Sequence, residues 1–307
     1  MHIYDALAFA LPVSLIGSDR SYAADAAEDW REQLQQWRAE NSAALSAPDG
    51  SLSLVGLELL RPGDNSVGTA PDNTIRLPGQ GNAHFATIRV EGNHIQLKPP
   101  RGGFPSELAV DGHAPREQAI VFDGPAPTRF TAGTLTFFVI RRGERNLLRI
   151  RDTQAPTLLN FKGLRWYPPD PHYRIESEWV PLARPKAETI HSIIGTSTRI
   201  LVPGFARFTL HGETVALEPL TQEDGKTLLF VVRDKTSGDT TYANARFLFT
   251  GLPDHGLDAP GKLVLDFNRL ENPPCAYTPY STCPLPPESN RLKIPIFAGA
   301  LRYAPLE

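Results

Sequence analysis

The stretch KTLLFVVRDKTSGDTTYANARFLF, residues 226–249, decides the fold of this chain. It holds two short runs rich in β-branched and aromatic residues, 226–233 and 240–249, with the triplet Ser237-Gly238-Asp239 between them. Two such runs separated by a short glycine-containing segment are typical of a β-hairpin. We therefore expect two antiparallel strands here, joined by a tight turn at the triplet.

The same pattern continues on both sides of this hairpin. Further strands are expected at residues 173–182, 188–194, 204–210, 214–220, 262–267 and 291–298, with a second tight turn at His211-Gly212-Glu213. Upstream, the segment YPPDP at 167–171 cannot continue the interior of a sheet, because proline has no backbone N–H to donate. The sequence predicts a C-terminal antiparallel β domain over residues 165–307, either a curved sheet or a barrel-like closure.

A second set of short runs precedes this boundary. Strands are expected at residues 51–60, 74–77, 84–90 and 94–98, followed by a hairpin of 134–142 with 146–151 across Gly143. The abundance of turn formers, Pro 29 and Gly 24, also favours sandwiches and barrels over helical folds. We expect an all-β protein with a β-sandwich over residues 49–155 and the C-terminal domain after it.

One helix is expected before the sandwich, within residues 24–48. Trp30, Leu34 and Trp37 recur at i, i+4 and i+7 among charged residues of the stretch 25–45. Two tryptophans on one stripe dock a helix onto a sandwich more often than they bind a ligand, and we interpret the stripe as a docking surface.

The N-terminus resembles a secretory signal. Residues 6–17 form an apolar run too short to span a bilayer, and small residues at Ser21 and Ala23 suit cleavage before Ala24. The first five residues carry no Lys or Arg, so a buried N-terminal segment is the alternative. We predict removal of residues 1–23 and export to the periplasm or the exterior. No later stretch is apolar enough for an integral membrane segment.

Composition narrows the class of protein. Of the 307 residues, 41% are hydrophobic and 21% charged, as in soluble globular proteins. The formal charge is -3 and no basic run is present, so counterion release offers little affinity for nucleic acid. The chain is long enough for two domains, each with its own core. Nothing in the sequence indicates an oligomeric state.

The phrase from Val67 to Ile88 resembles the forkhead-associated sandwich. It has Gly68, an Asn-x-Ile-x-Leu run at 73–77, and His84 opening the next strand. Phosphothreonine-reading members of that family carry Arg after the Gly and Ser two positions before the His, because a phosphate needs charged and hydroxyl donors. This chain has Thr69 and Asn82 at those places. We expect the scaffold without phosphothreonine binding, and a structural role for His84.

Two cysteines, Cys275 and Cys283, lie eight positions apart in a proline-rich stretch. In an oxidising compartment they predict a short-loop disulfide. Two buried thiols and a reactive thiol are the alternatives. No His or Cys neighbours them at ligand spacing, so no metal site is expected.

Polar residues concentrate in the predicted strands and loops of the C-terminal domain. The candidate site residues are Asp234, Thr236, Tyr242, Arg246, Asp266, Asn268, Asn272, Asn290 and Arg291. Their sequence words resemble the family called domain of unknown function 1684: Asp-x-Thr-Ser-Gly at 234–238, Asp-Phe-Asn at 266–268, Asn-Pro-Pro-Cys-Ala at 272–276, and Thr-Cys-Pro-Leu-Pro-Pro at 282–287. The resemblance extends upstream through Trp30 and 54–60. The chain departs from the family pattern at Ala245, Glu271 and Ala300. The family implies no activity.

Two hypotheses follow for the candidate site. The proline-rich loop should lie over the sheet as a cover, because it cannot pair as a strand. Beneath it, Arg246, Asp234 and Asp266 can form a buried structural charge network while the asparagines tie loop backbone to strands. Alternatively, the residues line a pocket for a small polar or anionic ligand, with Arg246 or Arg291 as the anion contact and Asp266 as a general base.

The sequence leaves open whether the chain is an enzyme. It contains no nucleophile elbow, zinc-protease helix, P-loop or dinucleotide fingerprint, and no cofactor is expected. We predict an exported ligand-binding or structural module of the cell envelope. A hydrolase that uses the carboxylates and Arg of the C-terminal domain is the alternative.

Overall fold

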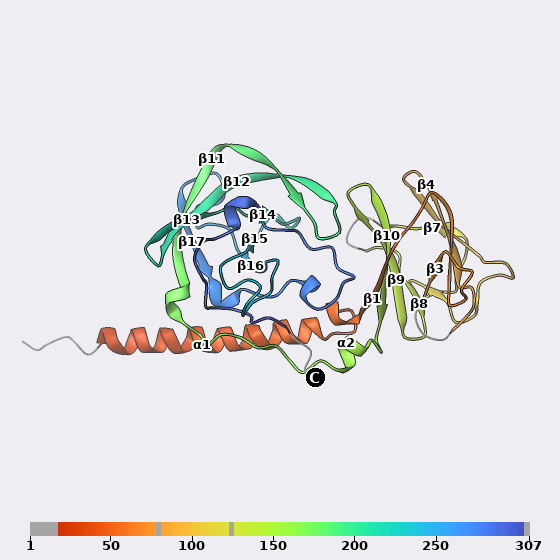
Figure 1. Ribbon diagram of the computed structural model, residues 1–307, viewed down its shortest axis with the longest axis horizontal. Coiled ribbons are helices and arrows are strands. Elements are labelled where there is room, and N and C mark those ends of the chain that lie inside the picture. Colours follow the sequence, from red (N-terminus) through yellow and green to blue (C-terminus); the bar gives the residue numbers. More distant parts are fainter. Residues whose placement is uncertain (1–17, 78–80, 123–125, 304–307) are drawn as a thin grey trace, which may run out of the picture.

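The computed structural model describes residues 18–77, 81–122 and 126–303. One long helix is followed by a β-sandwich and a second β domain (Figure 1). The protein is all-β apart from its N-terminal helix, as the sequence predicts. The predicted signal run, 6–17, lies outside the described residues. Within them, no helix combines the length and the apolar character that a membrane crossing needs.

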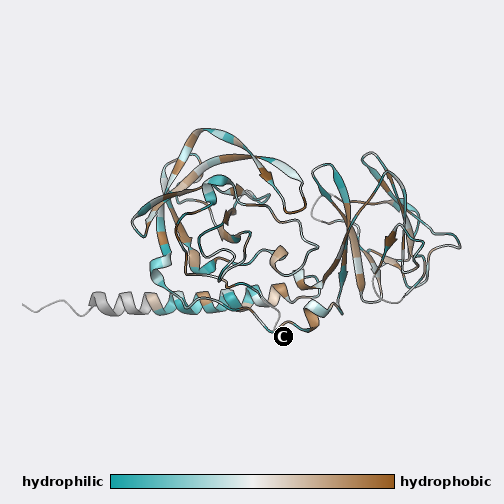
Figure 2. Cartoon of the chain, in the orientation of Figure 1, coloured by the Kyte–Doolittle hydropathy of each residue, from teal (hydrophilic) through white to brown (hydrophobic). Residues whose placement is uncertain are grey.

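Helix α1 (Ser18–Leu45) begins earlier than the expected residue 24 and ends within the predicted segment. It lies along the C-terminal domain, far in sequence from the strands that it covers (Figure 1). Trp30 and Leu34 are buried, with 9% and 0% of their surface exposed. Figure 2 shows hydrophilic residues along the middle of this helix. Trp30 and Leu34 of the predicted stripe are thus buried, whereas Trp37 is only partly buried.

The first β domain is a sandwich of two five-stranded sheets. In sheet order these are β1 (Leu54–Leu59), β10 (Arg145–Asp152), β9 (Leu135–Arg142), β8 (Phe130–Ala132) and β6 (Ala109–Val110), facing β3 (Ile75–Arg76), β2 (Gly63–Gly68), β4 (Ala86–Glu91), β5 (His94–Lys98) and β7 (Gln118–Ala119). Side chains from both sheets, such as Val67, Ile88 and Phe137, share one core. The hairpin predicted across Gly143 is present, and that glycine has a φ of 58°.

An irregular segment links the two β domains. It contains the short helix α2 (Pro156–Leu159) and the 3₁₀ turn η2 (Pro171–Tyr173). Four more 3₁₀ turns are η1 (Ser51–Ser53), η3 (Phe267–Arg269), η4 (Pro274–Ala276) and η5 (Glu288–Asn290). The last three lie in the proline-rich C-terminal part, where backbone donors are scarce.

The C-terminal domain consists of two antiparallel sheets that share a core, rather than a closed barrel. The four-stranded sheet has the order β13 (Glu213–Leu217), β12 (Ser197–Leu210), β11 (Arg174–His191) and β17 (Gly261–Asp266). The three-stranded sheet has the order β14 (Leu220–Thr221), β15 (Leu228–Val232) and β16 (Arg246–Thr250). Trp179 and Phe208 of the first sheet belong to the same core cluster as Phe230 of the second.

Strand β15 is buried on both faces. Leu228, Phe230 and Val232 point into the shared core. Leu229 and Val231 pack with Cys283 on the opposite face. The proline-rich loop therefore lies over the outer face of this sheet, as its missing backbone donors lead one to expect.

Three expectations about the C-terminal strands are wrong. The runs 173–182 and 188–194 form one strand, β11, whose pairing with β12 shifts register between Pro181 and Lys186. The runs at 226–233 and 240–249 do pair, but β16 begins only at Arg246, so residues 233–245 make a long folded loop instead of a tight turn. Residues 291–298 form no strand within the described chain, and the carbonyls of Ile296 and Ala298 accept instead from a buried guanidinium described below.

The tight turn predicted at His211-Gly212 is confirmed. It joins β12 to β13 with only these two residues between the strands. Their φ angles are 53° and 79°, the left-handed values that such a two-residue hairpin turn requires.

Candidate functional site

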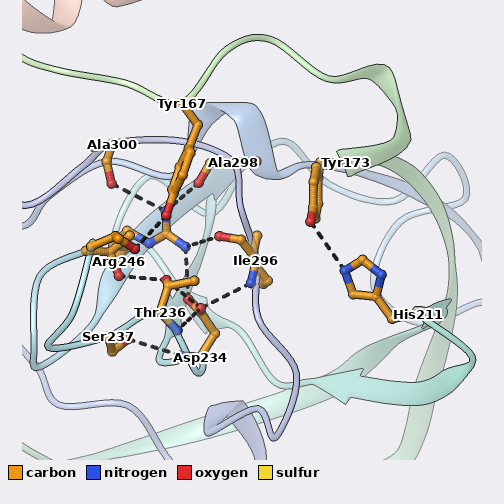
Figure 3. Close-up of polar contacts among 12 residues, drawn as sticks. Tyr167, Tyr173, His211, Asp234, Thr236, Ser237, Arg246, Ile296, Ala298 and Ala300 are labelled. Carbon is orange, nitrogen blue, oxygen red and sulfur yellow. Dashed lines mark hydrogen bonds and ion pairs between the residues drawn. The ribbon is translucent and has the colours of Figure 1, made fainter.

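The ion pair of Arg246 with Asp234 is the centre of a buried polar cluster. Arg246 begins β16 and lies opposite Val232, the last residue of β15, so Asp234 lies two residues beyond the strand end. Arg246 Nη2 donates to Asp234 Oδ2 across 2.9 Å, and neither side chain is exposed (Figure 3). The other carboxylate oxygen, Oδ1, accepts from the backbone N–H and hydroxyl of Thr236 at 2.8 and 2.7 Å.

The guanidinium also binds the C-terminal segment of the chain. Arg246 donates to the carbonyls of Ile296 at 3.0 Å and Ala300 at 3.4 Å, and to that of Ala298 (Figure 3). The backbone N–H of Ile296 donates to Asp234 Oδ1. Burial lowers the pKa of Arg246, and the Asp234 charge opposes that shift. The cluster is sealed from solvent, so its position suits a structural role and not contact with a ligand.

Asp266 is separate from this cluster, which corrects the predicted three-member charge network. It ends β17 and caps the following 3₁₀ turn: its Oδ1 accepts from the backbone N–H and the side-chain amide of Asn268 at 3.1 and 2.9 Å. Its Oδ2 accepts from the indole N–H of Trp30 at 2.8 Å. Arg246 has no part in these contacts. Asp266 fastens helix α1 to the C-terminal domain.

Three predicted asparagines tie loops to other segments. Asn268 exchanges two hydrogen bonds with the backbone of Asp170, and Asn290 exchanges two with the backbone of Glu218. Asn272 Nδ2 donates to the Leu301 carbonyl at 2.7 Å. All three bind loop backbone, but none of the partner residues lies in a strand, unlike the predicted ties of loops to strands.

Tyr242 and Arg291, the two remaining candidates, lie apart. The Tyr242 hydroxyl donates to the carbonyl of Cys275 at 3.0 Å, which holds the proline-rich loop. Arg291 is exposed, with its Nε 3.6 Å from a carboxylate oxygen of Glu288. The structure therefore places the two predicted anion contacts, Arg246 and Arg291, in different environments.

The two cysteines are neighbours but both are free thiols. The backbone N–H of Cys275 donates to Cys283 Sγ at 3.2 Å. The hydrogen bond with Cys283 lowers the pKa of the Cys275 thiol, and the same contact raises that of Cys283. The predicted disulfide is not shown and stays a prediction.

An open groove of about 500 Å³ lies between helix α1 and the C-terminal sheets. We call it the α1 groove; the residues that line it are Trp30, Gln33, Trp37, Arg174, Thr227, Leu248, Phe249, Thr250, Gly251, Val264, Asp266 and Arg269. Arg174 is paired in register with Asp266 across β11 and β17, so its side chain lies at the same end of the groove. Phe249 and Val264 are 42% and 40% exposed, high for apolar residues in mid-strand.

The two arginines of the α1 groove differ in their contacts. The Arg269 guanidinium lies over the Trp37 ring, 5.7 Å from its centroid, and its Nε is 4.0 Å from Asp266 Oδ2. Arg174 is exposed and makes no ion pair with any described residue. A free guanidinium that lines an open groove can bind an anion.

A second cavity, of about 300 Å³, lies at the C-terminal end of α1. Its lining includes Glu271, whose pKa burial raises to about 7, opposed by a hydrogen bond from Asn41. Sequence reasoning identified Glu271 only as a departure from a family pattern and did not identify Arg174 or Arg269. No local motif marks these residues, since Arg269 and Glu271 contact α1 residues more than a hundred positions away.

Comparison with known proteins places the C-terminal domain in a family. The family model described as "Protein of unknown function (DUF1684)" matches residues 159–300. An uncharacterised protein of Haloarcula marismortui, known from a solution NMR structure, is 33% identical; the match covers 46% of this chain and 77% of that one, with a TM-score of 0.40. No curated protein matches the chain. The chain belongs to the DUF1684 family of proteins of unknown function.

Proposed function

We propose that this protein is an exported binding module that takes a small anionic or polar ligand in the α1 groove. One contrast carries the proposal. The Arg246 cluster is closed to solvent, whereas Arg174 is exposed, unpaired among the described residues, and lines a groove walled by two tryptophans. Guanidinium and indole groups that converge on one open space are typical of recognition surfaces.

A binding role has more support than hydrolysis. Both carboxylate oxygens of Asp266, the expected general base, accept hydrogen bonds from Trp30 and Asn268. These hydrogen bonds position helix α1 and the 3₁₀ turn η3. A general base must instead reach a proton of the substrate or its water.

Export belongs to the proposal because of the apolar run at 6–17 and the small residues at Ser21 and Ala23. The backbone at these two residues is helical, as part of α1. Cleavage before Ala24 would shorten α1 at its start but leave Trp30 and Trp37, so the mature chain would keep the whole groove.

We also propose that the N-terminal sandwich is forkhead-associated-like but lacks the phosphate site. A Cβ on Gly68 would lie 2.1 Å from the Ala83 carbonyl oxygen, so the close approach there needs glycine. The Thr69 hydroxyl donates to the Asn82 carbonyl at 3.0 Å, and His84 Nδ1 lies 3.1 Å from Asn73 Oδ1. These hydrogen bonds hold neighbouring loops together, which supports a structural role for His84.

The test is titration of the full chain with small anions, namely inorganic phosphate and citrate, followed by tryptophan fluorescence. Binding should weaken about tenfold in Arg174→Gln, the loss of one charge-assisted contact. Arg291→Gln, an exposed arginine outside the groove, is the matched control and should bind as the unchanged protein does. Equal binding by both variants, or no response to either anion, would overturn the proposal.

A further inference from the structure

The cavity at the C-terminal end of α1 presents hydrogen-bond acceptors and acidic side chains but no basic side chain. The residues that line it are Asn41, Ala44, Leu45, Asp49, Gly50, Ser51, Glu271, Asn272, Pro274 and Tyr277. We call it the helix-end cavity. It lies where α1, the turn before η1 and the proline-rich loop meet, and the α1 groove shares none of its residues.

Asn272 supplies a buried acceptor that lacks a donor. The residue is 5% exposed and lines the cavity. Its Nδ2 donates to the Leu301 carbonyl, which fixes the orientation of the amide. Its Oδ1 has no hydrogen-bond partner among the described residues. A buried acceptor left unpaired costs about 1–3 kcal/mol, so a donor at this point would be stabilising.

The end of the helix supplies two more acceptors. Pro48 has no N–H, so the Ala44 carbonyl lacks the donor four residues ahead that a continuing helix would provide. Neither it nor the Leu45 carbonyl accepts a backbone hydrogen bond from beyond the helix within the described chain. Both oxygens face Gly50, where an added Cβ would lie 2.5 and 2.3 Å from them. The last turn of α1 carries no basic residue to offset its dipole.

Glu271 adds a carboxyl group whose pKa is raised by burial to about 7. Asn41 Nδ2 donates to its Oε2 at 2.5 Å. Asp49 and the Tyr277 phenol also line the cavity, and burial followed by the Glu271 charge raises the pKa of that phenol. Arg151 donates to the Gly50 carbonyl at 3.4 Å but does not line the cavity. Ionised Glu271 thus has no cationic partner there.

We infer that the helix-end cavity binds the primary ammonium group of a small organic amine. An ammonium has three N–H donors and no acceptor, and it matches the Glu271 carboxylate, Asn272 Oδ1 and a helix-end carbonyl. Tyr277 offers an aromatic wall to the charge. A metal ion is the less suitable occupant, because no group of three or more His, Cys, Asp or Glu residues with metal-binding geometry occurs in the described chain.

The experiment titrates the full chain with propylamine and uses propanol as the uncharged control, with calorimetry at roughly pH 8 and pH 6. Propylamine should bind and propanol should not. Binding should be about tenfold weaker at the lower pH, because protonated Glu271 no longer attracts the ammonium. Glu271→Gln should bind weakly at both pH values, whereas Glu58→Gln, an exposed glutamate elsewhere, should behave as the unchanged protein.

Several results would overturn the inference. These are equal binding of propylamine and propanol, full binding by Glu271→Gln, and Glu271-dependent binding of Ca²⁺ or Mg²⁺ in place of the amine. Absence of any binding would overturn it too. Circular dichroism of Glu271→Gln checks that the variant folds, and Asp49→Asn, at the rim, provides a second substitution whose amine affinity should fall less.

Discussion

Arg246 Nη2 lies 2.9 Å from Asp234 Oδ2, and neither side chain is exposed to solvent. Because the same guanidinium binds the carbonyls of Ile296, Ala298 and Ala300, this pair links the β15–β16 hairpin to the C-terminal segment. Removing one partner would leave the other charge buried and uncompensated.

Asp234→Ala should therefore lower the free energy of unfolding by about 3–5 kcal/mol. Urea denaturation measures this change in the free energy of unfolding. Asp239→Ala, an exposed aspartate of the same loop, is the control and should change stability by less than about 0.5 kcal/mol. Comparable losses in the two variants would contradict the buried pair.

Asp266→Ala should loosen helix α1 and not the Arg246 cluster. It leaves the Trp30 indole N–H without its acceptor, which costs about 1–3 kcal/mol. A double-mutant cycle with Trp30→Phe, measured by urea denaturation, isolates this contact. Strict additivity of the two substitutions would show that the hydrogen bond contributes nothing.

Stability should fall as pH rises from about 4.5 toward 7, because of Glu271. Burial raises the pKa of this carboxyl in the folded chain to about 7 from 4.5, so the folded state holds a proton that the unfolded state has released over that range. The stability that protonated Glu271 contributes is on the order of 3 kcal/mol, and it is fully lost above pH 7. Thermal melts across this range should show the slope, and Glu271→Gln should flatten it.

Oxidation should join Cys275 to Cys283. The hydrogen bond from the Cys275 backbone to Cys283 Sγ already brings the two residues together. In the chain-entropy model a loop this short contributes about 2.5 kcal/mol. Thiol titration of oxidised, unfolded protein checks this, and two titratable thiols in that sample would contradict the prediction.

Export should remove the first 23 residues, as small side chains at Ser21 and Ala23 suit signal peptidase. Mass spectrometry of the protein from its native host identifies the N-terminal residue, which should be Ala24. Intact protein that begins at Met1 in the cytoplasm would contradict this.

Features that depend on neighbouring residues could be predicted from the sequence. The tryptophan stripe of α1 repeats at helical spacing, and the His211-Gly212 turn has residues that tolerate positive φ. The pairing of Asp234 with Arg246 could be predicted as well, since Asp234 follows the first strand of a hairpin and Arg246 begins the second.

Features that depend on distant partners could not be predicted in this way. Asp266 meets Trp30, 236 positions earlier, and not the nearer Arg246. The segment 291–298 has the alternation of a strand, yet its carbonyls at 296 and 298 bind a guanidinium instead of a neighbouring strand. A periodic pattern indicates which side chains are buried, but it does not indicate which group will hydrogen-bond to the backbone.

Docking of α1 against the C-terminal domain also constrains the order in which the chain can fold. The helix is synthesised before both β domains, but Asp266 and Glu271, which accept hydrogen bonds from Trp30 and Asn41, follow more than two hundred residues later. Until then the buried Leu34 stripe has no surface to cover it. The C-terminal domain made alone would lack that cover in turn, so fragments of this chain should aggregate where the full chain does not.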